Sequence, residues 1–115
     1  MAAPAIDPAT FRSLQDAAGT EFVAELVGTF LEEAPAMLAE LEGALGVRDA
    51  ETFRRVAHSL KSNCQTFGAM GLGALARELE VGGLDRALQS GADPLAALKR
   101  EYSVAAAALK GLADA

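Results

Sequence analysis

Apolar residues recur along most of the chain at the three- and four-residue spacing of an amphipathic α-helix. The sustained apolar/polar alternation of a half-buried strand is absent, and so are the Asn-Gly and Asp-Gly pairs typical of hairpin turns. Residues that cap or break helices divide the periodic pattern into five segments. The sequence therefore predicts an all-α fold.

The expected helices follow from these segments. Asp7-Pro8 opens a short first helix, which ends at Gly19. Longer helices are expected from Thr20, as a cap, to about Leu45, from the cap Asp49 to Gly68, from about Met70 to Gln89, and from Asp93-Pro94 through Leu112. Short connections between long helices predict a single domain over residues 1–115, an up-down-up-down four-helix bundle with a short additional N-terminal helix.

Two of these helices contain residues that disturb a helix. Pro35 is expected to bend its helix rather than end it, because the apolar pattern resumes beyond it. The Gly82-Gly83 pair is expected to weaken the helix over 70–89 locally, since glycine is a poor helix former.

The helix over 20–45 carries two apolar stripes, more than one core contact needs. One stripe contains Phe22, Leu26, Phe30, Met37 and Leu41, and the other contains Val23, Val27, Leu31, Leu38 and Leu45. Val23, Val27 and Leu31 either pack against the leading helix or stay exposed as a docking patch for another protein. The sequence leaves both alternatives open.

The single histidine, His58, lies outside the apolar arc of its helix. At about 100° per residue, an arc of roughly 100° contains Phe53, Val56, Ala57, Leu60, Cys64 and Phe67. His58 is about 150° from the centre of that arc, which predicts an exposed imidazole. On the same side lie Arg54, Lys61, Ser62 and Gln65.

Composition narrows the class of protein. Half of the 115 residues are apolar, which is enough for a core, but only 5% are aromatic, so alanine and leucine must supply most of the packing. The formal net charge of −6 argues against nucleic acid or an anionic membrane as the partner. With no signal peptide, no segment long enough to span a bilayer and one cysteine, Cys64, the chain is expected to be cytoplasmic and reduced.

A lone exposed histidine most often has no chemical role, and that interpretation stays open. Zinc sites draw on several His or Cys ligands, so no metal is expected, and no P-loop or GxGxxG motif suggests a nucleotide cofactor. What remains chemically is a neutral imidazole that attacks a phosphoryl group presented by another protein. Lys61 could supply a cation to that group, and the small Ser62 leaves the approach to the ring open.

Several of these residues resemble the signature of the histidine-containing phosphotransfer (HPt) domains of two-component phosphorelays. The matching stretches are Ala57-His58-Ser59-Leu60-Lys61, Gly68-Ala69, Leu72 and Leu79-Glu80. The order of the predicted helices is also similar, and the resemblance covers nearly the whole chain.

The resemblance implies a role for each matching position. His58 would accept the phosphoryl group at Nε2, and Lys61 would stabilise that group or a carboxylate of the partner. Glu80 would hydrogen-bond His58 Nδ1 and fix the tautomer; alternatively, it pairs with Arg77 three residues earlier. Ser62 stands where the family most often has glycine.

The surroundings of the motif supply further expected site residues. Arg77 lies at a position that flanks the site in some members of the family. Gln65 and Arg54 share the histidine ridge and are expected at the rim of the site or in docking. Gly68 is expected to end its helix without a chemical role.

The function implied is that of a phosphorelay intermediate rather than a stand-alone enzyme. His58 would accept a phosphoryl group from a receiver-domain aspartate and pass it to another receiver domain, with response regulators or hybrid histidine kinases as partners. The chain would act as a monomer without a cofactor, the Mg²⁺ belonging to the receiver. The alternatives are an interaction module whose histidine is never phosphorylated, the phosphotransfer domain of a larger histidine kinase and, more distantly, an enzyme with its own small substrate.

Overall fold

The structure is a computed structural model that describes residues 4–91 and 93–114. This part of the chain forms five α-helices and no strand. The helices are α1 (Pro8–Ala18), α2 (Thr20–Val47), α3 (Ala50–Phe67), α4 (Met70–Gln89) and α5 (Ala96–Asp114). The all-α prediction is confirmed.

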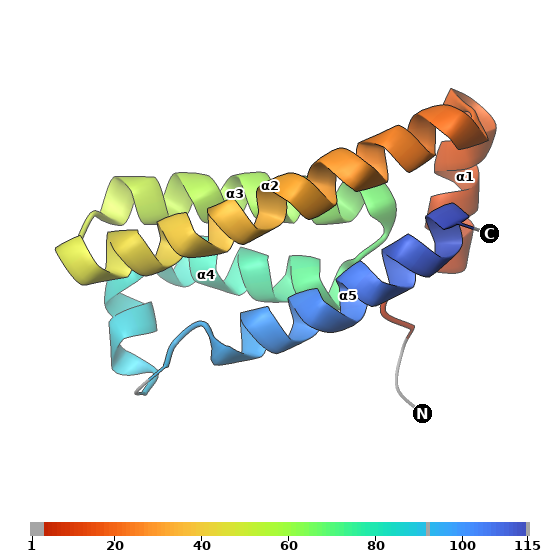
Figure 1. The fold of residues 1–115 in the computed structure, drawn as a ribbon. Coiled ribbons are helices and arrows are strands. Elements are labelled where there is room, and N and C mark those ends of the chain that lie inside the picture. Colours follow the sequence, from red (N-terminus) through yellow and green to blue (C-terminus); the bar gives the residue numbers. More distant parts are fainter. Residues whose placement is uncertain (1–3, 92, 115) are drawn as a thin grey trace.

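The four long helices lie side by side, with α1 across one end (Figure 1). Helix α2 contacts α3, α3 contacts α4, α4 contacts α5, and α5 contacts α2, while α1 packs on α2 and α3. The most extensive of these interfaces joins α3 to α4. None of the helices in the described residues has the length and apolar character needed to cross a membrane.

Side-chain capping explains where α1 and α3 begin. The side chain of Asp7 accepts a hydrogen bond from the Thr10 N–H at 3.2 Å, and that of Asp49 accepts one from the Thr52 N–H at 3.1 Å. Each carboxylate satisfies a backbone N–H that the first turn leaves without a helical partner. The predicted caps Asp7 and Asp49 are therefore confirmed.

Two predicted helix starts are wrong. Gly19 alone separates α1 from α2 and occupies the N-cap position of α2, so Thr20 is already helical and caps nothing. The last helix begins at Ala96, not at Pro94. The reason is that Asp93 caps a preceding turn, in which its Oδ1 accepts from the Leu95 N–H at 3.2 Å.

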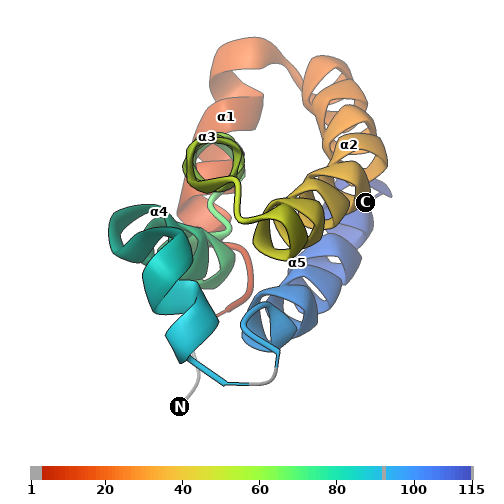
Figure 2. The ribbon, with the colours of Figure 1, turned by 90° about the vertical axis from the view of Figure 1, so that its left-hand side faces the viewer.

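Proline and glycine act differently inside the long helices. Helix α2 continues through Pro35, as predicted. In α4, the expected weakening at Gly82-Gly83 is a complete interruption, because Gly83 has φ 75° and ψ −177°. Glycine tolerates this conformation because it lacks a Cβ. The last turns of α4 therefore point away from its main axis (Figure 2), and Leu84 and Ala87 enter the core.

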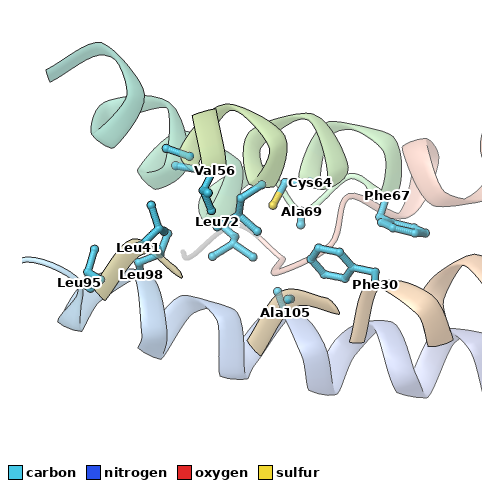
Figure 3. Close-up of a cluster of buried hydrophobic side chains, with 14 of the residues drawn as sticks. Phe30, Leu41, Val56, Cys64, Phe67, Ala69, Leu72, Leu95, Leu98 and Ala105 are labelled. Atoms are coloured by element: carbon cyan, nitrogen blue, oxygen red, sulfur yellow. The ribbon is translucent and has the colours of Figure 1, made fainter. Parts of the chain in front are cut away.

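Small aliphatic side chains fill most of the core between the helices (Figure 3). Two aromatic rings lie near that of Phe30, whose centroid is 5.5 Å from that of Phe67 and 6.3 Å from that of Tyr102. The core therefore rests mainly on alanine and leucine packing, as the composition predicts.

The structure decides between the two alternatives for the stripes of α2. Val23 and Val27 are buried and Leu31 is half-buried, so the two valines pack inside and are not an exposed docking patch. Helix α2 needs a wide apolar face because it contacts three helices, α1, α3 and α5. Two apolar residues of the predicted helices are exposed: Phe22, in the first turn of α2, and Leu112, in the last turn of α5.

Candidate functional site

Helix α3 carries the candidate site and is fixed at both ends. Asp49 caps its first turn, and Gly68 ends it in the left-handed conformation with its N–H bonded to the Cys64 carbonyl at 2.9 Å. Its buried residues are the six of the predicted apolar arc. His58 projects on the opposite side, and its side chain is 55% exposed.

Helix α4 approaches this part of α3 closely because small residues line the contact. A Cβ added at Gly73 would lie 3.2 Å from the Cys64 Cβ, and Ala69 and Ala76 are fully buried. Glu80 follows Gly73 by seven residues, about two helical turns, and so lies on the same face of α4. Sequence reasoning missed this role of Gly73, although a glycine two turns before Glu80 was a usable signal.

The Glu80 carboxylate bridges two side chains of α3. Its Oε2 lies 2.7 Å from His58 Nδ1, and its Oε1 lies 2.8 Å from Lys61 Nζ. Among the described residues, Glu80 makes no ion pair with Arg77. Of the two arrangements expected for Glu80, the contact with His58 is the one present, and it joins α3 to α4 through three polar side chains.

The surroundings of Glu80 favour its ionised form. The Lys61 ammonium is the largest cause of a lowered Glu80 pKa; burial opposes it, and His58 lowers the pKa further. Oε1 is shielded from solvent and is held by Lys61 as an ion pair without an aligned hydrogen bond. An ionised carboxylate can only accept, so His58 Nδ1 carries the hydrogen of their contact and Nε2 of the neutral ring keeps its lone pair.

Two other predicted residues flank His58 along α3. Arg54 lies one turn before the histidine and Ser62 one turn after it, and both are exposed. Neither makes a side-chain hydrogen bond or ion pair with His58, Lys61 or Glu80 in the part of the chain that the structure describes. Their place in the site therefore rests on the helical spacing.

The remaining two predicted residues share a depression beside the site. Gln65 of α3 and Arg77 of α4 line a shallow hollow of about 180 Å³ together with Lys61 and the half-exposed Met70. The structure thus brings Lys61, Gln65 and Arg77 together on one side of the polar trio, over the contact between α3 and α4.

A metal-binding cluster or a reactive free thiol would be another kind of reactive centre among the described residues. Within residues 4–91 and 93–114, no group of three or more His, Cys, Asp or Glu side chains is arranged to hold a metal ion. Cys64 is buried between α3 and α4, and burial raises the pKa of its thiol to about 12. At neutral pH it is an inert thiol that contributes to packing.

Comparisons with known proteins find one protein family and one solved structure that this chain matches over most of its length. The family model described as Hpt domain matches residues 25–113, which include His58, Lys61 and Glu80. The chain is similar to the crystal structure of histidine-containing phosphotransfer protein B from Pseudomonas aeruginosa PAO1, with a TM-score of 0.84 and 28% sequence identity. That match covers 98% of this chain and 97% of the other. A comparison with curated protein sequences gave no match.

Proposed function

The chain belongs to the Hpt domain family, and from this premise we propose that it is a phosphorelay intermediate. His58 accepts a phosphoryl group from an aspartate of one receiver domain and passes it to an aspartate of another. One observation carries the proposal: an exposed imidazole is held through Nδ1 by Glu80 at 2.7 Å, which leaves Nε2 free.

The proposed step follows from that orientation. The lone pair of His58 Nε2 forms a bond to phosphorus while the bond from phosphorus to the aspartyl oxygen breaks, and the aspartate leaves as a carboxylate. The ring becomes positively charged as its lone pair is used. Because Glu80 is anionic and contacts Nδ1, it stabilises that charge and holds the proton in place. Return of the group to a second receiver is the reverse of the same step.

Charge around the histidine supports an acidic partner. Arg54, Arg55, Lys61 and Arg77 account for four of the ten basic residues in a chain whose net charge is −6. A receiver domain presents the acidic site that holds its aspartate, and opposite charges favour encounter and orientation. We propose no metal or cofactor for this chain itself, since the Mg²⁺ of the reaction belongs to the receiver.

The proposal extends to the organisation of the chain. We propose that residues 1–115 form a single domain that acts as a monomer in the cytoplasm. We also propose an up-down-up-down four-helix bundle of α2 to α5. The closed ring of contacts between these helices supports the bundle, as does the similarity to the Pseudomonas protein over nearly the full length of both chains.

Transfer from a radiolabelled phospho-receiver tests the function. Wild type is expected to acquire an acid-labile, base-stable label, as a phosphohistidine does, and His58→Gln is expected to acquire none. Both proteins should unfold at the same temperature, because the His58 side chain is mostly exposed. Ser59→Ala, which alters the neighbouring exposed residue, is the matched control and should be labelled normally.

The same experiment separates the alternatives. Equal labelling of wild type and His58→Gln would exclude His58 as the acceptor. A receiver that binds the chain but labels neither protein would favour an interaction module. Labelling by an ATP-dependent kinase domain, but by no receiver, would favour the phosphotransfer domain of a larger histidine kinase.

A further inference from the structure

Two side chains of α3 stand on opposite sides of His58. At about 100° per residue, Lys61 is displaced by about 60° to one side of the histidine and Ser62 by about 40° to the other. Lys61 pairs with Glu80, so its side is the one that faces α4. Ser62 is exposed on the side away from α4.

The contact to Glu80 turns Nε2 of the ring away from α4, to the side of His58 on which Ser62 lies. Nδ1 points to Glu80 on α4, at 2.7 Å, and Nε2, separated from Nδ1 by one ring carbon, faces away from α4. Side chains of a helix also lean toward its N-terminus, so Ser62, four residues after His58, leans toward the ring. The Cα–Cβ bond of Arg54, four residues before His58, points away from the ring.

The Ser62 hydroxyl makes no hydrogen bond within the described residues. Helical hydroxyls often donate to the carbonyl four residues earlier, and two among the described residues do so. Thr66 Oγ1 donates to the Ser62 carbonyl at 3.2 Å, and Ser103 Oγ donates to the Lys99 carbonyl at 3.3 Å. Ser62 Oγ makes no such bond, so its donor is available to a group on the ring.

Lys61 is less available than its position in the sequence suggests. Its ammonium lies 2.8 Å from Glu80 Oε1, and only 19% of its side chain is exposed. Any contact that it makes to a phosphoryl group is shared with that carboxylate. Of Ser62 and Lys61, Ser62 is therefore the donor whose direction and freedom both suit a phosphoryl oxygen on Nε2.

We propose that the Ser62 hydroxyl donates a hydrogen bond to an oxygen of the phosphoryl group carried by Nε2 of phosphorylated His58. This inference rests on the proposed function in taking Nε2 as the site of phosphorylation. Hydrolysis proceeds through a loose, metaphosphate-like transition state, in which the phosphoryl oxygens carry less charge than in the phosphohistidine. The hydrogen bond therefore stabilises the phosphohistidine more than the transition state, and Ser62 lengthens its lifetime.

The lifetime can be measured without any partner protein. Phosphoramidate phosphorylates imidazole directly: a bond forms from Nε2 to phosphorus, the phosphorus–nitrogen bond of the reagent breaks, and ammonia leaves. The decay of phosphorylated His58 is then followed by ³¹P NMR. Because one hydrogen bond is involved, Ser62→Ala should shorten the half-life roughly threefold to tenfold. Ser62→Thr, which keeps a hydroxyl, should decay much as wild type does.

Ser59→Ala is the matched control, because it removes a hydroxyl from another exposed residue of α3 that lies about 100° from His58. Its half-life should equal that of wild type. A half-life of Ser62→Ala that equals wild type would overturn the inference, and so would an equal shortening in Ser59→Ala or in Ser62→Thr. Since loading needs no receiver, these results are independent of whether the relay proposal holds.

Discussion

The two faces of α3 differ in what holds their residues in place. The inner face consists of six buried side chains, all apolar or, for Cys64, an un-ionised thiol. The outer face carries His58, which is fixed through one contact to Glu80 of another helix. Packing therefore decides the position of the inner residues, whereas hydrogen bonding and charge decide that of the outer ones.

This difference separates stability from chemistry on a single helix. Many neighbours hold each inner residue, so its loss should change the free energy of unfolding. An outer residue has few neighbours, so its loss should change the reactivity of the imidazole and leave the fold intact. The next three predictions test that separation.

Leu60→Ala should have the largest effect on stability. Leu60 is fully buried and directly precedes Lys61 of the site. Truncation should lower the free energy of unfolding by about 2–5 kcal/mol, because it removes apolar contacts and leaves a cavity. Urea denaturation followed by circular dichroism measures the loss. The folded variant should still be phosphorylated on His58 by phosphoramidate.

Arg54→Ala is the control on the outer face and should change the free energy of unfolding by no more than about 0.5 kcal/mol. Similar losses in the two variants would contradict the separation between the faces.

Gly68→Ala, at the C-terminal end of α3, should have the next largest effect on the free energy of unfolding. Gly68 has φ +85°, and an added Cβ would lie 2.9 Å from the Thr10 Cβ and 3.1 Å from the Asp7 carbonyl oxygen. Backbone strain and this clash with the segment that leads into α1 should cost about 1–3 kcal/mol, measured by thermal or urea unfolding.

Gly43→Ala provides a control of opposite sign. Gly43 lies inside α2 with no atom near an added Cβ. Alanine there should stabilise the protein by up to about 1 kcal/mol. A Gly68→Ala variant as stable as wild type would show that the end of α3 can shift away from Thr10 without cost.

Glu80→Gln should have the smallest effect on stability, and that effect should depend on pH. The pKa of Glu80 is lowered in the folded protein, chiefly by Lys61. The unfolded chain therefore binds the proton more readily, and stability from this carboxylate is present above an unfolded pKa of about 4.3. It is lost as the pH falls through the lowered folded pKa. The advantage of wild type over Glu80→Gln should therefore shrink in acid.

Urea unfolding of both proteins between neutral pH and pH 3 measures this difference. Glu78→Gln, an exposed change two residues earlier on α4, should show a much weaker pH dependence. A difference between wild type and Glu80→Gln that stays constant over this range would contradict the coupling to Lys61.

Much of α3 could be predicted from the sequence because its signals are local. Its cap Asp49, its final glycine Gly68 and its six inward residues all follow from helical period and capping chemistry. The outward position of His58 follows from the same period. Neither result needs knowledge of another helix.

Predictions that required a second helix were less successful. Whether Val23 and Val27 are buried or exposed depended on which side of α2 its three neighbours cover. The effect of Gly83 depended on a core that Leu84 and Ala87 enter only after the chain turns.

The sequence alone determined that this chain is helical and that its histidine faces outward, because helical period relates residues a few positions apart. The tertiary structure decided which partner Glu80 selects. Arg77 is its neighbour along α4, but the close approach of α3 and α4 at Gly73 and Cys64 brings Glu80 to His58 and Lys61 instead. A helical period fixes the face on which a side chain lies, whereas the packing of a second helix fixes what that face meets.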